Sequence, residues 1–194
     1  MNDPVFGLAR LRQATQEIHA AFEVELKVAK PAAGKNDYRI FIQAMWGWLS
    51  PFEKTLWQAE WPHEIDATSR TDKSSWLLSD LRSAGLQDAD IAALPLSSCN
   101  LDLTSPAARF GVAYVLEGAQ LGSQVLAKRL GPVLQPWPAR WLAGYGNESS
   151  AKWRQFMQSA ESNLGNEEAS RIAAQSARQT FSSLQTWFHL QGAA

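Results

Sequence analysis

The residues best suited to chemistry share one face of a predicted helix near the N-terminus. His19 lies in the stretch LRQATQEIHAAFE, with Arg12 seven residues before it and Glu23 four residues after it. At 1.5 Å of rise per residue, Arg12 is about 10 Å from His19 along the helix axis. Imidazole is a good ligand for iron, and Glu23 can accept a hydrogen bond from its other ring nitrogen. This face therefore offers an axial metal ligand, a carboxylate that orients it, and a cation for the anionic arms of a bound macrocycle.

Three glycines form a second candidate surface on another predicted helix. Gly111, Gly118 and Gly122 are separated by seven and four residues, so at about 3.6 residues per turn they point the same way. Each glycine inside a helix costs about 1 kcal/mol relative to alanine. We therefore expect something to lie flat against this helix backbone, either another helix or a planar ligand.

Helices must position both surfaces, because the apolar residues follow a helical period along nearly the whole chain. The predicted helices run from Asp3-Pro4 to Pro31, from Asn36-Asp37 onward with a kink or restart at Pro51, over 69–84, over 88–94, from Ser105-Pro106 to an end at Gly131-Pro132, from 147 or 148 through 156, and over 166–189. No strand pattern or repeat is visible. We predict an all-α protein with one domain over residues 1–194, built as an irregular multi-helix bundle.

Composition excludes several functional classes. The net charge of −1 is evenly spread, which argues against binding to nucleic acid or to an anionic membrane surface. Cys99 is the single cysteine, so no intramolecular disulfide can form. The N-terminus does not read as a signal peptide, and no apolar run reaches the roughly 20 residues that span a bilayer. We expect a cytoplasmic protein that does not bind membranes.

Two segments resemble the haem oxygenase family. LRQATQEIHAAFE is similar to the proximal helix of these enzymes and GVAYVLEGAQLGSQVL to their distal helix, and the two occur in the family's order. The basic–aromatic segment KWRQF at 152–156 and the pair Phe181 and Phe188 are weaker likenesses. Together these segments extend the resemblance from about Leu8 to Phe188.

The resemblance implies roles for the polar residues around a bound haem. His19 would be the proximal ligand of the haem iron, and Glu23 would orient its ring. Arg12 and Arg154 would pair with the haem propionates.

It also implies roles for three nonpolar residues. Gly118 and Gly122 would let the backbone of the distal helix approach the haem. Phe181 would pack near the haem edge.

The family's reaction follows as an expectation. Haem, serving as substrate and prosthetic group, is opened to biliverdin, Fe²⁺ and CO with O2 and reducing equivalents. An external donor such as a reductase, ferredoxin or flavodoxin would supply the electrons. A bacterial phytochrome could accept the biliverdin.

The distal segment departs from the family pattern at one position. Many members carry an aspartate directly after the first distal glycine, where it anchors water, and this chain has Ala119 there. Tyr114 stands four residues before that glycine instead of five. Glu117, Gln120 and Gln124 are candidates for replacing the polar anchor.

Three alternative functions remain open from the sequence. Ala119 motivates a haem carrier that binds without turnover. A thiaminase-like protein would need Cys99 as a nucleophile, but no base stands near it in the SSCN segment. In a helix-packing scaffold, the glycines would form only a seam between helices.

Overall fold

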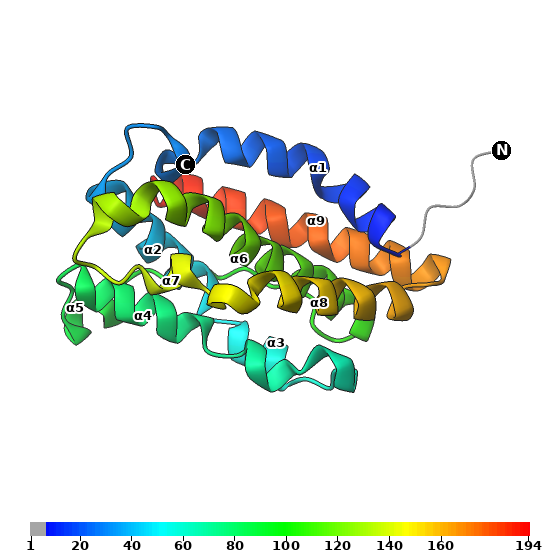
Figure 1. Cartoon of the computed structure of the whole chain (residues 1–194). Helices are drawn as coiled ribbons and strands as arrows, with labels where there is room; N and C mark the ends of the chain where they lie inside the picture. The colour runs from blue at the N-terminus through cyan, green and yellow to red at the C-terminus, as the bar shows by residue number, and fades with distance from the viewer. Residues whose placement is uncertain (1–6) are drawn as a thin grey trace.

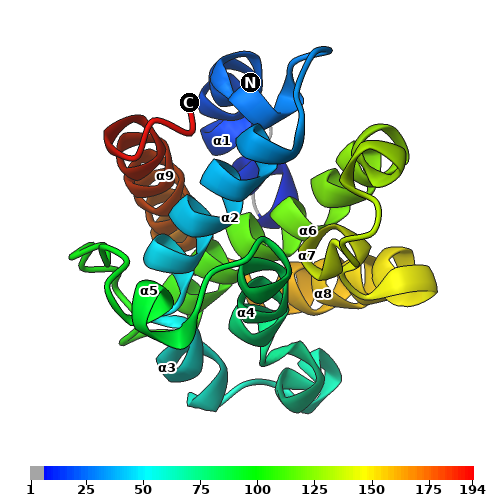
Figure 2. The same cartoon turned by 90° about the vertical axis from the view of Figure 1, so that its left-hand side faces the viewer.

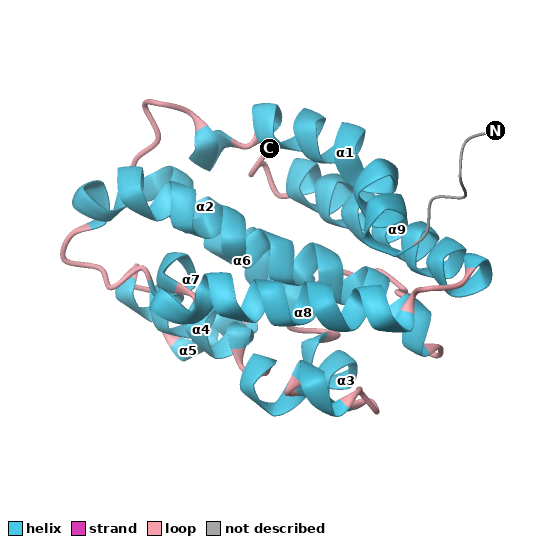
Figure 3. Ribbon diagram, turned by 45° about the vertical axis from the view of Figure 1, so that its right-hand side comes forward, coloured by secondary structure: helices cyan, strands magenta, loops and turns pink. Residues whose placement is uncertain are grey.

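The computed structural model describes residues 7–194, and over this range the chain forms helices and loops without strands (Figures 1 and 3). The all-α prediction is confirmed. The elements are α1 (Gly7–Glu25), η1 (Lys27–Ala29), α2 (Lys35–Leu49), α3 (Glu53–Gln58), η2 (His63–Ile65), η3 (Ala67–Arg70), α4 (Lys73–Ser83), α5 (Asp88–Ala92), α6 (Pro106–Leu134), α7 (Arg140–Ala143), η4 (Gly146–Glu148), α8 (Ser149–Asn163) and α9 (Glu167–Leu190).

Polar caps start the two longest helices. The Ser105 hydroxyl accepts a hydrogen bond from the Ala108 amide at 3.1 Å, and Pro106 occupies the first turn of α6. The Asn166 side chain accepts from the Ala169 amide at 2.9 Å at the start of α9. Both predicted starts are confirmed, whereas the predicted start at Asp3-Pro4 lies outside the described residues.

Two prolines act differently from one another. α2 ends at Leu49 and α3 begins at Glu53, so Pro51 separates two helices instead of kinking one. The predicted end of α6 at Gly131-Pro132 is wrong, because the helix continues to Leu134. Gly131 has no Cβ to clash with the proline ring, and Leu134 is fully buried, which stabilises the additional turn.

Helix α9 joins the two helices that carry the candidate residues. It packs along α1 on one side and along α6 on another, while α8 packs against α6 (Figures 1 and 2). The colour gradient in Figure 1 shows that α1, α6 and α9 all run in the same direction. Moving forward along the sequence in any of the three therefore moves the same way through the molecule.

Large apolar side chains fill the space between the helices. Trp48, Trp141, Phe110 and Phe156 are each at most 1% exposed. These tryptophans pack the core and do not line a ligand surface. Within residues 7–194, no helix combines the length and apolar character needed to cross a membrane.

Candidate functional site

Helix α1 places His19 and Glu23 together on its solvent-facing side. The side chains are 53% and 62% exposed, and His19 Nδ1 lies 3.6 Å from Glu23 Oε2. This distance is longer than a hydrogen bond, so the carboxylate is an electrostatic neighbour of the ring. Leu11, Thr15 and Phe22 are buried on the adjoining face of α1. The amphipathic pattern of α1 thus keeps the imidazole at the surface, able to bind a ligand.

Phe181 of α9 supports the His19 ring from behind. The two rings meet edge to face, with centroids 5.5 Å apart and an interplanar angle of 69°. Phe181 also meets Phe22 edge to face at 5.9 Å and is itself 8% exposed. A buried aromatic ring in this position restricts the orientation of the imidazole.

The first glycine of the α6 face is a packing residue. A Cβ on Gly111 would lie 2.3 Å from the Ala173 carbonyl oxygen and 2.8 Å from the Ala177 amide nitrogen, both in the backbone of α9. Real Cβ atoms do not approach backbone atoms so closely, so only glycine allows this contact. At Gly111 the face is a seam between helices.

The other two glycines are open. A Cβ on Gly118 would come no closer than 3.9 Å to the tip of the Trp153 ring, and one on Gly122 would meet nothing within 4 Å. Packing among the described residues therefore does not require glycine at Gly122. The sequence posed a choice between a helix seam and a flat-ligand surface; the structure shows a seam at Gly111 and an open backbone at Gly118 and Gly122.

Along the helix axes, Gly118 lies within about one turn of the level of Phe181 and the imidazole, and Gly122 lies one turn further on. Gly111 contacts Ala177 of α9, and Phe181, one turn further along α9, contacts His19. Figure 1 shows that α6 and α9 run in the same direction. The seven residues from Gly111 to Gly118 carry α6 about 10 Å forward, and the four from Ala177 to Phe181 carry α9 about 6 Å forward. The geometry thus places the open Gly118 near the level of the imidazole along the bundle, on the helix that packs against the other side of α9.

The ends of α1 and α6 are joined near this region. Arg129, seven residues after Gly122, donates to the Val28 carbonyl at 2.5 Å and also to the Lys30 carbonyl. Both carbonyls follow directly after α1. The two helices are therefore fixed to each other beyond their candidate residues.

The structure places all three candidate polar anchors away from the glycine face. Glu117 and Gln120 are 3% and 2% exposed, and they point about 100° and 200° away from Gly118 around the helix. Gln124 donates to the Gly146 carbonyl at 3.1 Å. Glu117 accepts a hydrogen bond from Tyr145, whereas the Gln120 side chain makes no hydrogen bond among the described residues. That any of the three replaces the missing acid at Ala119 stays a prediction.

The two predicted arginines are exposed on separate helices. Arg12 lies on α1 and Arg154 on α8, next to Trp153. Within residues 7–194, neither guanidinium makes a hydrogen bond or ion pair. Their pairing with a common anion therefore stays a prediction.

Two surface grooves occur elsewhere. One of about 740 Å³ lies between α1 and α9 and is lined by Arg10 and Arg178, and one of about 460 Å³ is lined by Trp57 and Trp61. His19, Gly118 and Gly122 line neither groove.

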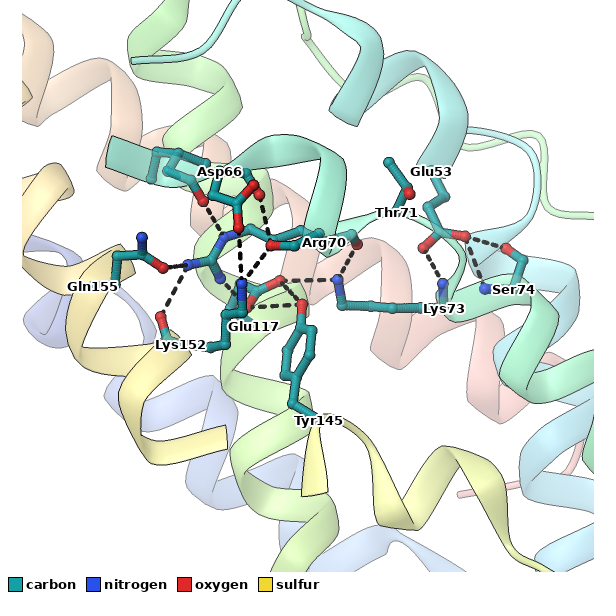
Figure 4. Close-up of polar contacts among 12 residues, drawn as sticks. Glu53, Asp66, Arg70, Thr71, Lys73, Ser74, Glu117, Tyr145, Lys152 and Gln155 are labelled. Atoms are coloured by element: carbon teal, nitrogen blue, oxygen red, sulfur yellow. Dashed lines mark hydrogen bonds and ion pairs between the residues drawn. The ribbon is translucent and has the colours of Figure 1, made fainter. Parts of the chain in front are cut away.

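Sequence reasoning missed a buried ionic cluster behind α6. Arg70 and Lys73 are fully buried and both pair with Glu117, whose side chain is 1% exposed (Figure 4). Glu117 is the lone acid in the apolar segment FGVAYVLEGAQLG, and a buried carboxylate requires a cationic partner. That signal could have revealed the cluster, although nothing in the segment RTDK identifies the partners.

The fold and this site define an all-α protein with an exposed imidazole on α1 and an open glycine backbone on α6. The model of the family described as Heme oxygenase matches residues 7–190, and the chain belongs to this family.

Two comparisons agree with this assignment. The chain is 37% identical over 112 residues to a "Heme oxygenase" of Xanthomonas campestris pv. campestris (strain 8004), covering 57% of this chain and 63% of that relative. The alignment therefore spans somewhat less than two thirds of the curated relative. The fold is similar to a crystal structure of NO- and CO-bound heme oxygenase from Neisseria meningitidis, with a TM-score of 0.74 and 21% identity over 95% of this chain and 92% of that one.

Proposed function

We propose that this chain is a haem oxygenase that opens haem to biliverdin, Fe²⁺ and CO, using O2 and electrons from an external donor. The observation that carries the proposal is the half-exposed His19 on α1 together with the open backbone of α6 at Gly118 and Gly122, in a chain of this family. Haem, when bound, supplies the redox chemistry and the activation of O2.

The residues present fit a haem. His19 provides a nitrogen ligand, and Gly122 leaves space where a Cβ would meet nothing. Glu23, 3.6 Å from Nδ1, favours a proton on that nitrogen and so leaves Nε2 as the iron ligand. Phe181 holds the ring in place from the protein side.

The protein's contribution is positioning. The glycine backbone of α6 would keep side chains away from a bound haem on that side and leave room for O2. Arg12 and Arg154 pair with the propionates through charge-assisted hydrogen bonds and so limit rotation of the ring. We expect a cytoplasmic reductase, ferredoxin or flavodoxin as donor, and a bilin acceptor such as a bacterial phytochrome.

The His19→Ala variant tests the proposal. Purified protein with haem, O2 and a reductant should lose its Soret band while biliverdin absorbance rises, and His19→Ala should abolish both changes. His189→Ala is the matched control, because His189 is likewise about half exposed, at 47%, and lies 3.3 Å from a glutamate, Glu25, but stands in the last turn of α9. A stable Soret band in the wild type would instead indicate a haem carrier, and wild-type turnover in His19→Ala would refute the ligand assignment.

The arginine pair has its own test. Replacing Arg12 and Arg154 together with alanine should yield a broader mixture of biliverdin isomers, whereas Arg171→Ala, an exposed arginine paired with Glu168, should not. Unchanged regiochemistry in the double variant would contradict the propionate clamp.

A further inference from the structure

Three donors from separate parts of the chain converge on the Glu117 carboxylate of α6. Arg70 Nη1 lies 2.5 Å from Oε2, Lys73 Nζ lies 3.0 Å from Oε1, and the Tyr145 hydroxyl donates to Oε1 at 2.9 Å (Figure 4). These donors come from the end of η3, the start of α4 and the loop before η4. Glu117 is therefore held from several directions at once.

The Arg70 guanidinium is itself fixed by the surrounding backbone. Nε donates to the Ile65 carbonyl at 2.7 Å, and Nη2 donates to the Lys152 carbonyl at 3.0 Å and to Gln155 Oε1 at 3.2 Å. Its side chain is fully buried. One guanidinium thus connects the η2–η3 segment, α6 and α8 in a rigid fork geometry.

Lys73 completes the cluster in an aromatic enclosure. Its ammonium lies 4.8 Å from the centre of the Trp57 ring and 5.1 Å from that of Tyr145. Burial lowers the pKa of Lys73, and the charge of Glu117 opposes that shift. Burial and Glu117 both raise the pKa of Tyr145, so its hydroxyl keeps its proton and remains a donor.

Stability alone does not account for such a cluster. Buried ion pairs are often no more stabilising than apolar residues of similar size, because removing the charges from water offsets their attraction. Their best-attested use is to specify one register of packed elements. The question is therefore which part of the molecule depends on the rotation and axial position of α6.

The register of α6 controls the open glycine backbone. Gly118 directly follows Glu117, and between the seam at Gly111 and the Arg129 contacts, a Cβ at Gly122 would meet nothing within 4 Å on the glycine side. With Cα atoms about 2.3 Å from the axis, a rotation of about 20° moves the backbone by about 0.8 Å. Displacements near 1 Å can change a reaction rate by about 100-fold.

We propose that Glu117 is a positioning residue, which sets the rotation and depth of α6 and thereby the placement of Gly118 and Gly122 over the haem. The proposal rests on the function proposed above. Glu117 acts through the helix backbone and does not touch the haem.

The test compares Glu117→Gln with Asp80→Asn. Asp80 is a matched control, because it is a 1% exposed carboxylate on α4 that accepts from the Tyr38 hydroxyl and from the amides of Arg140 and Trp141. Both substitutions remove one buried negative charge, but only Glu117 lies on α6. The readouts are the infrared C–O stretch of the ferrous CO complex, which reports the distal surroundings, and the distribution of biliverdin isomers.

Glu117→Gln should shift or split the C–O band and lower the ratio of major to minor isomer about tenfold, as a displaced reacting geometry requires. Asp80→Asn should keep the wild-type band and isomers while losing thermal stability. A wild-type band and isomer ratio in Glu117→Gln would overturn the proposal, as would equal shifts in both variants.

Tyr145→Phe keeps the test decisive if Glu117→Gln does not fold. It removes one hydroxyl donor and leaves both ion pairs in place, so it should shift the C–O band in the same direction by a smaller amount. An unshifted band in folded Tyr145→Phe would count against the proposal in that case. The C–O band needs haem binding but no turnover, so wild-type protein that binds no haem refutes the proposed function, separately from any result on Glu117.

Discussion

Gly111 and Gly122 stand on one face of one helix, yet they do opposite things. At Gly111 the α9 backbone lies so close that a Cβ would be 2.3 Å from a carbonyl oxygen, whereas at Gly122 a Cβ would meet nothing within 4 Å. Close packing of α6 on α9 explains why residue 111 is a glycine. No packing contact among the described residues explains the glycine at 122. A glycine pattern therefore shows where a helix admits close approach, but the neighbouring elements decide what approaches.

Gly122→Leu should have the largest effect, because it should weaken haem binding without destabilising the fold. Gly122→Leu fills the open face, so haem affinity should fall by about 100-fold or more, equivalent to about 2.7 kcal/mol, with little change in the stability of the haem-free protein. Spectroscopic haem titration and urea unfolding measure the two effects. Lys128→Leu, an exposed position about 120° further around α6, is the control and should bind haem normally. Normal haem affinity in Gly122→Leu would remove this face from the site.

Replacing Gly111 with alanine, which adds only a methyl group, should destabilise the fold. The Cβ of Gly111→Ala would force α6 and α9 apart at backbone atoms, which we expect to cost about 2 kcal/mol after the gain of about 1 kcal/mol in helix propensity. Urea unfolding of the haem-free protein gives this value. Wild-type stability in Gly111→Ala would mean that the seam does not exist in solution.

Alanine at position 122 should instead stabilise the haem-free protein. Gly122→Ala adds a methyl group to an exposed helical position, so unfolding of the haem-free protein should cost up to about 1 kcal/mol more. The comparison between the two sites fails if both alanine variants shift stability with the same sign.

The smallest effect concerns the surface beside the buried cluster behind α6. Hydrogen bonds from Ser69 and Lys152 lower the pKa of Asp66 from 3.8 to about 2. A lowered folded-state pKa stabilises the protein above pH 3.8, and this contribution is lost as the pH falls toward 2. Asp66 is exposed, so Asp66→Asn should cost less than about 1 kcal/mol near pH 7.

Unfolding at pH 7 and at pH 2 tests this expectation, with Asp102→Asn as a comparison, because Thr104 similarly lowers the pKa of that exposed carboxyl. The stability gap between wild type and Asp66→Asn should be smaller at pH 2 than at pH 7, and haem affinity should be the same in both. A gap that is undiminished at pH 2 would contradict the assignment.

Local signals in the sequence predicted most of the helices. Ser105-Pro106 and Asn166 mark helix starts by local hydrogen bonding, which neighbouring residues suffice to specify. The end of α6 was mispredicted, because Pro132 is a local stop signal and the burial of Leu134 is a tertiary effect.

In the candidate site, too, contacts within one helix were predictable from the sequence, whereas contacts between helices were not. The spacing of His19 and Glu23 within one helix was enough to predict that their side chains meet, since helical periodicity alone brings residues four apart together. The contact of Phe181 with His19 joins two helices 162 residues apart in the chain and became visible only in the fold.

The sequence by itself determined the helices, the exposed histidine face and the glycines of α6, because each depends on residues within a few turns of one another. Tertiary structure alone decided that Gly111 is a seam while Gly122 is open, and that Glu117 is held by Arg70, Lys73 and Tyr145. The physical reason is that a residue's local pattern fixes the direction of its side chain, whereas the packing of distant elements fixes what it meets there.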